Sequence, residues 1–312
     1  MEAKGSLMTI NIDGKPLEKL IDAVSKGIGT LYRPRQIRKE ADAQAYAIKV
    51  VENAKAVACS EAQLIDAETA ERISQRLVAK EARRQNNIDT VVEDAAKELV
   101  GKEVSDEAIS EDWATRFFNI VQDVSEDEMK TLWAKILAKE IEKPSSYSLR
   151  TLELLRNISY EEAELFRKIS DFVIKEGGCF VFSKEGVLEK YGLRYIDQVR
   201  LREAGFLQSG EMMSRTYKTG NGSIAYSNMI YGDLFVKFTI PPHANDIHMP
   251  ILLLTQAGCE IFELIDTKEN LDYLKDMAAF IRSKNPEVKI QYSNIIERND
   301  NQVRYVTPMK DV

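Results

Sequence analysis

The feature that most constrains the fold is a long stretch, Arg35 to Val100, which contains neither glycine nor proline and lies between Pro34 and Gly101. At about 1.5 Å of rise per residue, one straight helix over this stretch would extend roughly 100 Å. A compact chain of comparable length has a radius of gyration of only about 20 Å. We therefore expect these residues either to fold back as a helical hairpin or to project and pair with another chain.

Alanine dominates the first half of this stretch. It has the highest helix propensity, and its small side chain lets helices approach one another closely. The heptad pattern is imperfect because Gln44 and Lys55 fall on the same seam, so we do not predict a regular coiled coil. We expect a homo-oligomer with an interface of small and branched apolar residues: Ala41, Ala45, Ile48, Val51, Ala58, Ala62 and Ile65.

The weakest helix formers in the stretch are Gln85, Asn86 and Asn87. The side chain of Asn87 is suited to capping the start of a second helix. We predict a long helix from about Arg35 to Gln85 that ends near this point, where the chain turns back. A projecting rod is the alternative, since both arrangements agree with the sequence.

Two further helices follow, and each places a tryptophan, Trp113 or Trp133, among apolar residues at helical spacing. Two capping boxes, in which a serine and a glutamate three positions later satisfy backbone N–H groups, mark helix starts at Ser125–Glu128 and Ser159–Glu162. With a helix over about 148–157, these elements predict a four-helix bundle. We place the bundle at residues 101–176, after an extended helical region at residues 1–100.

The composition changes after Gly178, where glycines become frequent and short β-rich runs appear, so a third part at residues 177–312 is predicted. Two short helices, at about 183–191 and 195–204, precede a predicted hairpin around Gly220–Gly222. This order is typical of a winged helix-turn-helix. The expected fold class is mainly α, with long N-terminal helices, a helical bundle and a C-terminal α+β module resembling a winged helix.

A DNA reader of this kind presents basic side chains on its second helix, where Arg194, Arg200 and Arg202 are available. Asp197 and Glu203 interleave with them. The net charge of the chain is −7, which argues against a broad electrostatic footprint for nucleic acid. Nucleic-acid binding is therefore an alternative that we do not favour.

The two histidines, His243 and His248, lie in one proline-bounded loop with Asp246 between them. Histidine and carboxylate ligands together suit zinc or iron, so a metal-dependent enzyme is a further alternative. The spacing matches no strong metal motif, and the chain contains no P-loop, GxGxxG or GxSxG sequence. We favour a protein without catalytic activity and expect no cofactor.

The first residues, Met1 to Met8, lack the apolar core of a signal peptide, and no run of about 18 apolar residues occurs. Both observations predict a cytoplasmic protein. A basic cluster that includes Arg33 follows an amphipathic helix, which is also the pattern of a membrane-surface anchor. Glu18 and Asp22 on that helix would be repelled by anionic lipid, so we do not expect membrane binding.

Three cysteines, Cys59, Cys179 and Cys259, are far apart in the sequence and odd in number. This spacing fits neither a disulfide framework nor a CxxC metal pair. We interpret them as small buried apolar residues.

Four segments carry a resemblance to a known family: Gly27–Pro34 (GIGTLYRP), Asp127–Ile141 (DEMKTLWAKILAKEI), Pro144–Leu155 (PSSYSLRTLELL) and Leu254–Phe262 (LTQAGCEIF). In this order, over most of the chain, they resemble a bacterial family classified as domain of unknown function 2806. The resemblance brings no catalytic residue, cofactor or substrate. It implies a bacterial cytoplasmic protein of a kind often encoded near mobile elements or defence genes.

The hypothesis that follows is a non-enzymatic assembly or scaffold protein. It would oligomerise through its alanine-rich helices and offer its C-terminal module to a protein partner, in antiviral (phage) defence or mobile-element biology. The alternatives are a DNA-binding winged-helix regulator and a metal-dependent enzyme at the loop that holds His243 and His248.

Overall fold

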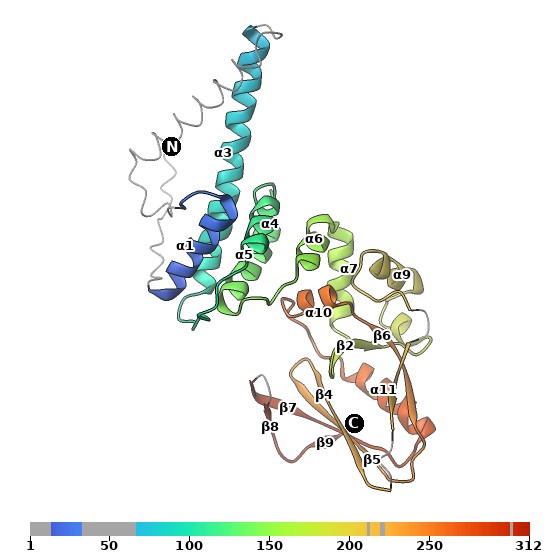
Figure 1. The fold of residues 1–312 in the computed structure, drawn as a ribbon. Coiled ribbons are helices and arrows are strands. Elements are labelled where there is room, and N and C mark those ends of the chain that lie inside the picture. The colour runs from blue at the N-terminus through green and yellow to red at the C-terminus, as the bar shows by residue number, and fades with distance from the viewer. Residues whose placement is uncertain (1–13, 33–66, 211–212, 219–221, 300–301) are drawn as a thin grey trace, which may run out of the picture. The chain divides into compact units, whose positions relative to one another are not determined.

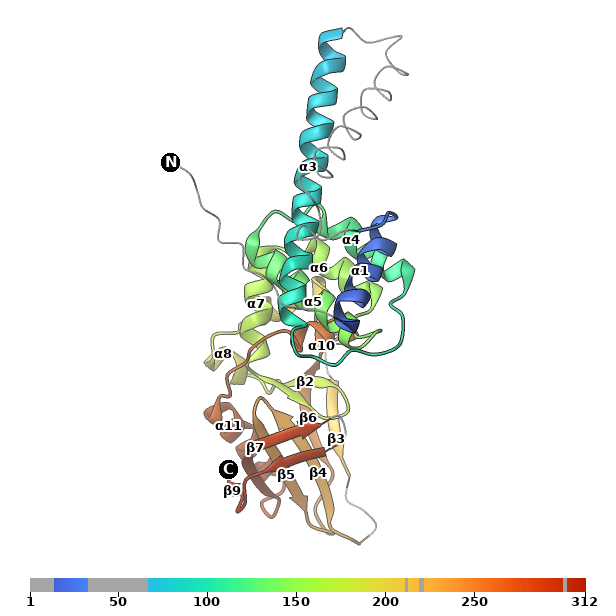
Figure 2. The ribbon, with the colours of Figure 1, turned by 90° about the vertical axis from the view of Figure 1, so that its left-hand side faces the viewer.

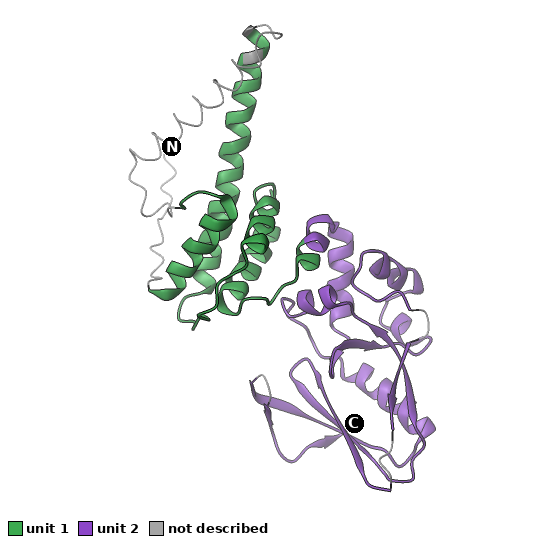
Figure 3. Cartoon of the chain, viewed as in Figure 1, with its two compact units in different colours: residues 1–152 green, residues 153–312 purple. Residues whose placement is uncertain are grey.

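The computed structural model describes residues 14–32, 67–210, 213–218, 222–299 and 302–312 (Figure 1). The contacts between residues divide the chain into two compact units, residues 1–152 and 153–312 (Figure 3). The boundaries predicted from the sequence lie after residues 100 and 176. The division in the structure falls within one helix, α6 (Leu149–Asn157).

The main helices of the N-terminal unit are α1 (Lys15–Ile28), α3 (Ala67–Glu98), α4 (Glu111–Val121) and α5 (Asp127–Glu142). Helix α1 packs against α4, and α3 packs against α5. At the centre, the fully buried ring of Trp133 meets Phe117 edge to face, with 5.5 Å between the ring centroids. Trp113 stacks on Phe117 at 4.9 Å and donates its indole N–H to the carbonyl oxygen of Tyr147 at 2.9 Å.

The composition of this helical core differs from the bundle predicted at residues 101–176. The apolar faces of α4 and α5 are covered by α1 and by the second half of α3, both of which precede Gly101. Val91, Ala95 and Leu99 supply fully buried side chains from the end of α3 and just beyond it. In contrast, α7 (Tyr160–Ser170) belongs to the C-terminal unit.

The predicted end of the long helix at Gln85–Asn87 is wrong, because α3 continues through these residues without interruption. The buried Asn87 donates its amide N–H to the carbonyl oxygen of Gln122 at 2.9 Å, just after α4. Asp89 accepts a hydrogen bond from the hydroxyl of Tyr32 at 3.0 Å. These tertiary hydrogen bonds offset the low helix propensity of asparagine, which is the basis of the predicted helix end.

The C-terminal unit is built on a nine-stranded antiparallel sheet with the order β3-β6-β2-β1-β4-β5-β7-β8, with β9 paired to β7 (Figure 1). The strands are β1 (Val173–Lys175), β2 (Cys179–Phe182), β3 (Met213–Tyr217), β4 (Ala225–Tyr231), β5 (Leu234–Ile240), β6 (Ile247–Leu253), β7 (Lys289–Asn299), β8 (Gln302–Tyr305) and β9 (Lys310–Asp311). In β5, buried side chains alternate with half-buried ones, which is the period of a strand packed on one face. The predicted fold class, mainly α with a winged-helix-like module, is therefore wrong.

The predicted hairpin around Gly220–Gly222 does not form. Strand β3 pairs with β6, while β4 pairs with β1 and β5, so β3 and β4 are separated within the sheet by three strands. The two short helices before β3 are present as α8 (Val187–Lys190) and α9 (Tyr195–Glu203). They lead to β3 at the edge of a large sheet and not to a wing. The pairing of β3 is set by β6, which lies far along the chain, and not by the local turn signal.

The described part of the C-terminal unit also contains the helices α7, α8, α9, α10 (Gln256–Phe262) and α11 (Leu271–Lys284), of which α7, α8, α10 and α11 are labelled in Figure 2. Helix α11 packs against β6, and its fully buried Tyr273 donates a hydrogen bond to the carbonyl oxygen of Phe182 at 3.0 Å. The capping box predicted at Ser159 and Glu162 is confirmed at the start of α7. At α5 the residue before the helix is Glu126 and makes no side-chain cap, so the box predicted at Ser125 is wrong.

Candidate functional site

The first half of α3 extends beyond the other helices of its own unit (Figures 1 and 2). We call residues 67–86 the arm; at about 1.5 Å per residue it spans roughly 30 Å. None of its described side chains is buried. From the next residue onward the same continuous helix, with the turn that follows it, buries Asn87, Ile88, Asp89, Val91, Val92, Ala95, Ala96 and Leu99. The burial therefore changes abruptly along one uninterrupted helix.

One side of the arm carries an apolar stripe. Ile73 and Leu77 are half-buried and lie four positions apart, which places them on the same side of the helix. Gln75 and Ala79, which point elsewhere around the helix, are exposed. A single helix of this length is marginal in water, because most helical stability in proteins comes from packing an apolar face. The arm thus has the length and pattern of a helix that packs against a partner.

The charges of the arm are distributed unevenly along its length. Glu68 and Glu71 lie at the outer end, and Arg72 and Arg76 follow. The charged side chains nearest to the helical core are mainly basic, Lys80, Arg83 and Arg84, with Glu81 among them. A second copy packed antiparallel would bring the acidic end of each arm to the basic end of the other.

The arm is anchored where it leaves the core. Arg84 donates two hydrogen bonds to the carboxylate of Asp123, at 2.9 and 3.0 Å, and a third to Glu81 at 3.0 Å. The hydrogen bond from the guanidinium lowers the pKa of Asp123. A lowered carboxyl pKa stabilises the folded state above the unfolded pKa, and this contribution is lost as the pH falls through the folded pKa. The anchor therefore holds the base of the arm at neutral pH.

The interface residues predicted from the sequence, Ala41 to Ile65, lie outside the described residues, just before the arm in the chain. Ile73 and Leu77 are not among the interface residues predicted from the sequence. Their spacing of four residues was a usable signal, but the alanines upstream formed a longer pattern.

The three arginines proposed to read DNA do not share one surface. Arg194 precedes α9 and pairs with Asp197 at 3.2 Å. Arg200 is exposed, whereas the Nε atom of Arg202 is buried and has no hydrogen-bond partner within the described part of the chain. At about 100° per residue, the side chains of Arg200 and Arg202 leave α9 on nearly opposite sides. Arg200 and Arg202 therefore do not point to the same side of α9.

The proposed metal ligands are also separated by their local contacts. His243 pairs with Glu287, and both side chains are largely exposed. His248, on β6, shares a hydrogen bond of 3.0 Å with Thr216 on the neighbouring strand β3, and Asp246 is exposed. Across the described ranges, no group of three His, Cys, Asp or Glu side chains is arranged to hold a metal ion.

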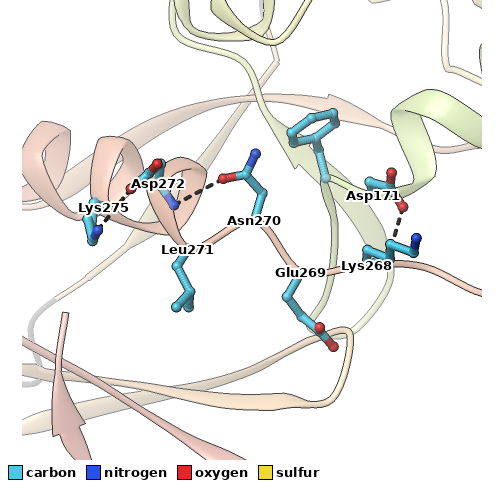
Figure 4. A pocket seen from close by; sticks show the side chains of 8 residues that line it. Asp171, Lys268, Glu269, Asn270, Leu271, Asp272 and Lys275 are labelled. Carbon is cyan, nitrogen blue, oxygen red and sulfur yellow. Dashed lines mark hydrogen bonds and ion pairs between the residues drawn. The ribbon is translucent and has the colours of Figure 1, made fainter.

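An open pocket of about 560 Å³ lies at the start of α11 (Figure 4). It is lined by Asp171, Phe172, Lys268, Glu269, Asn270, Leu271, Asp272 and Lys275. Asp171 accepts the backbone N–H of Lys268 at 3.0 Å, and Asp272 pairs with Lys275 at 2.8 Å. Asn270 caps α11 by accepting two backbone N–H groups at 3.0 and 3.1 Å. These polar groups hold the loop and the helix start, and the lining offers no nucleophile paired with a base.

Within the described residues, no helix combines the length and apolar character needed to cross a bilayer. The family described as a protein of unknown function (DUF2806) has a sequence model that matches residues 71–278, a range that begins within the arm. The resemblance inferred from four short segments is thereby confirmed, while the bacterial origin stays a prediction. No curated protein and no solved structure matches the chain.

Proposed function

The chain belongs to the DUF2806 family, whose description names no activity, and we propose that it is a non-enzymatic assembly protein that pairs with a second copy of itself through the arm. The observation that carries this proposal is the change in burial along α3. The helix remains continuous past Asn87, but its outer half buries no described side chain while keeping an apolar stripe.

The distribution of charge favours a second copy as the partner. In an antiparallel pair, Glu68 and Glu71 of one arm face the basic end of the other, so both ends of the interface gain opposite-charge contacts. The alanine-rich residues that precede the arm would extend the same interface, as the sequence analysis expects. A protein partner for the C-terminal unit and a role in phage defence or mobile-element biology remain predictions.

Co-expression of two differently tagged full-length copies tests this pairing. We expect each tag to capture the other copy. The double variant Ile73→Asp, Leu77→Asp should reduce this capture at least tenfold, because two buried carboxylates at the interface cost several kcal/mol when they lack partners.

The matched control is Gln75→Asp, Ala79→Asp, which adds the same two charges to exposed positions of the same helix. It should retain capture, and far-UV circular dichroism should show equal helix content in both variants. Equal capture by the two double variants, or no capture by the wild type, would contradict the proposal.

A further inference from the structure

The sheet of the C-terminal unit has one face that packs into the core and one that remains accessible over β4, β5 and β7. In β5 every second side chain is buried: Leu234, Val236, Phe238 and Ile240. On this inner face Phe238 meets Tyr217 of β3, with 5.7 Å between the ring centroids. Tyr231 of β4 lies 5.9 Å from Tyr273 of α11 in the same way. The other face of these strands is the one that a ligand can reach.

The register of β4 with β5 decides which side chains share the accessible face, because residues opposite one another in an antiparallel pair point to the same side. Three such pairs define what we call the open face: Tyr226 with Thr239, Asn228 with Lys237, and Ile230 with Phe235. None of these side chains is buried. Strand β7 continues the open face, since Gln291 lies opposite Lys237 and Lys289 lies opposite Thr239.

Aromatic rings lie at two places on this face. The side chain of Tyr226 is 60% exposed. Phe235 stacks on Tyr305 of β8, with 4.4 Å between the ring centroids and 14° between the ring planes. This stack extends the open face toward the edge of the sheet. Accessible rings of this kind bind unpaired nucleic-acid bases by stacking, largely independently of base identity.

The charged side chains of the open face are basic. The ammonium group of Lys237 lies 4.6 Å from the ring centroid of Tyr226, at the centre of the face. Asp311 of β9, opposite Gln291, pairs with Lys289 at 3.9 Å. Asp233 lies in the turn that joins β4 to β5, at the end of the face farthest from Tyr226. The end of the face that carries Tyr226 and Lys237 is therefore complementary to a negatively charged ligand.

We propose that the open face binds single-stranded nucleic acid, with bases stacked on Tyr226 and on the Phe235–Tyr305 stack and a phosphate group beside Lys237. A duplex hides the faces of its bases, so the exposed rings favour a single strand. The amide groups of Asn228 and Gln291 flank Lys237 and offer both donors and acceptors to base edges. This site is independent of the proposed self-association, which involves residues of the other unit.

Fluorescence anisotropy with the full chain tests the binding. The probes are labelled oligouridylate and oligothymidylate of about 12 nucleotides, within the usual site size of such proteins. We expect at least one of them to bind in the micromolar range at low salt, and a duplex of the same length to bind at least tenfold more weakly. No binding of either single strand, or equal binding of the duplex or of a polyglutamate peptide, would overturn the proposal.

Substitution of the exposed ring separates stacking from non-specific attraction. Tyr226→Ala should weaken binding of the single strand at least fivefold, because one stacked base is lost. Tyr226→Phe keeps the ring and should retain binding. The matched control is Tyr160→Ala, since Tyr160 is 70% exposed at the start of α7 in the same unit. Equal affinity of the wild type and Tyr226→Ala, or equal losses in Tyr226→Ala and Tyr160→Ala, would contradict stacking on the open face.

The salt dependence of binding supplies a second readout. Each phosphate contact of a single strand contributes about 0.7 to the slope of log affinity against log salt concentration. Lys237→Gln should lower this slope by about that amount, because it removes one such contact. Lys284→Gln, at an exposed position in the last turn of α11, should leave the slope unchanged. A slope that Lys237→Gln does not alter, or that both variants lower equally, would show that no phosphate lies beside Lys237.

Discussion

Replacing Trp133 with alanine is expected to lower the free energy of unfolding of the N-terminal unit by about 3–5 kcal/mol. The indole is fully buried and meets Phe117 edge to face, so the substitution removes a large apolar surface and leaves a cavity. Urea denaturation followed by fluorescence measures the effect. The chain has two tryptophans, so Trp113 remains in this variant and reports on the same helical core.

Leu31→Ala is the control for the loss of Trp133. Leu31 belongs to the same unit but is 73% exposed, so its truncation should change stability by no more than about 0.5 kcal/mol. A loss below about 1 kcal/mol in Trp133→Ala would mean that the helices do not pack around this residue.

The second large effect is expected from Gly258→Ala. Whether this substitution stabilises or destabilises the C-terminal unit is informative. In most helices, replacing an interior glycine with alanine stabilises the protein by roughly 0.5–1 kcal/mol. At Gly258 the added Cβ atom would lie 2.4 Å from the carbonyl oxygen of Phe206, so α10 or the chain at Phe206 must move. We expect a destabilisation of about 1–3 kcal/mol, measured by hydrogen exchange of peptides from the C-terminal unit.

Cys259→Ala provides the comparison in the adjacent position of α10. It shortens a half-buried side chain without adding a Cβ atom, so its effect should be clearly smaller than that of Gly258→Ala. If Gly258→Ala stabilises the unit, the close approach of α10 to the chain at Phe206 is incorrect.

Local sequence patterns predicted the helices better than the sheet. The spacing of Phe117 with Trp113 and the capping box at Ser159 encode local structure, and both correspond to helices α4 and α7. Asn87 shows the limit of local helix propensity, because the residue to which its side chain donates a hydrogen bond, Gln122, lies at the end of another helix, α4. The misassigned hairpin at Gly220–Gly222 has a related cause, since the partner of β3 lies beyond β5 in the chain.

The candidate sites likewise combine features that local sequence patterns predict with features that depend on residues far apart in the chain. The apolar spacing of Ile73 and Leu77 is readable in the sequence, although only the structure shows that burial stops at Asn87. The close approach of α10 to the chain at Phe206 had no sequence signal, because it brings together residues that are far apart in the chain.

Pairing of two arms is the central claim, and the molar mass of the full chain in solution tests it most directly. Light scattering at micromolar concentration should give at least twice the chain mass of 35.4 kDa. The variant Ile73→Asp, Leu77→Asp should give 35.4 kDa under the same conditions. A wild-type mass of 35.4 kDa throughout the micromolar range would contradict self-association through the arm.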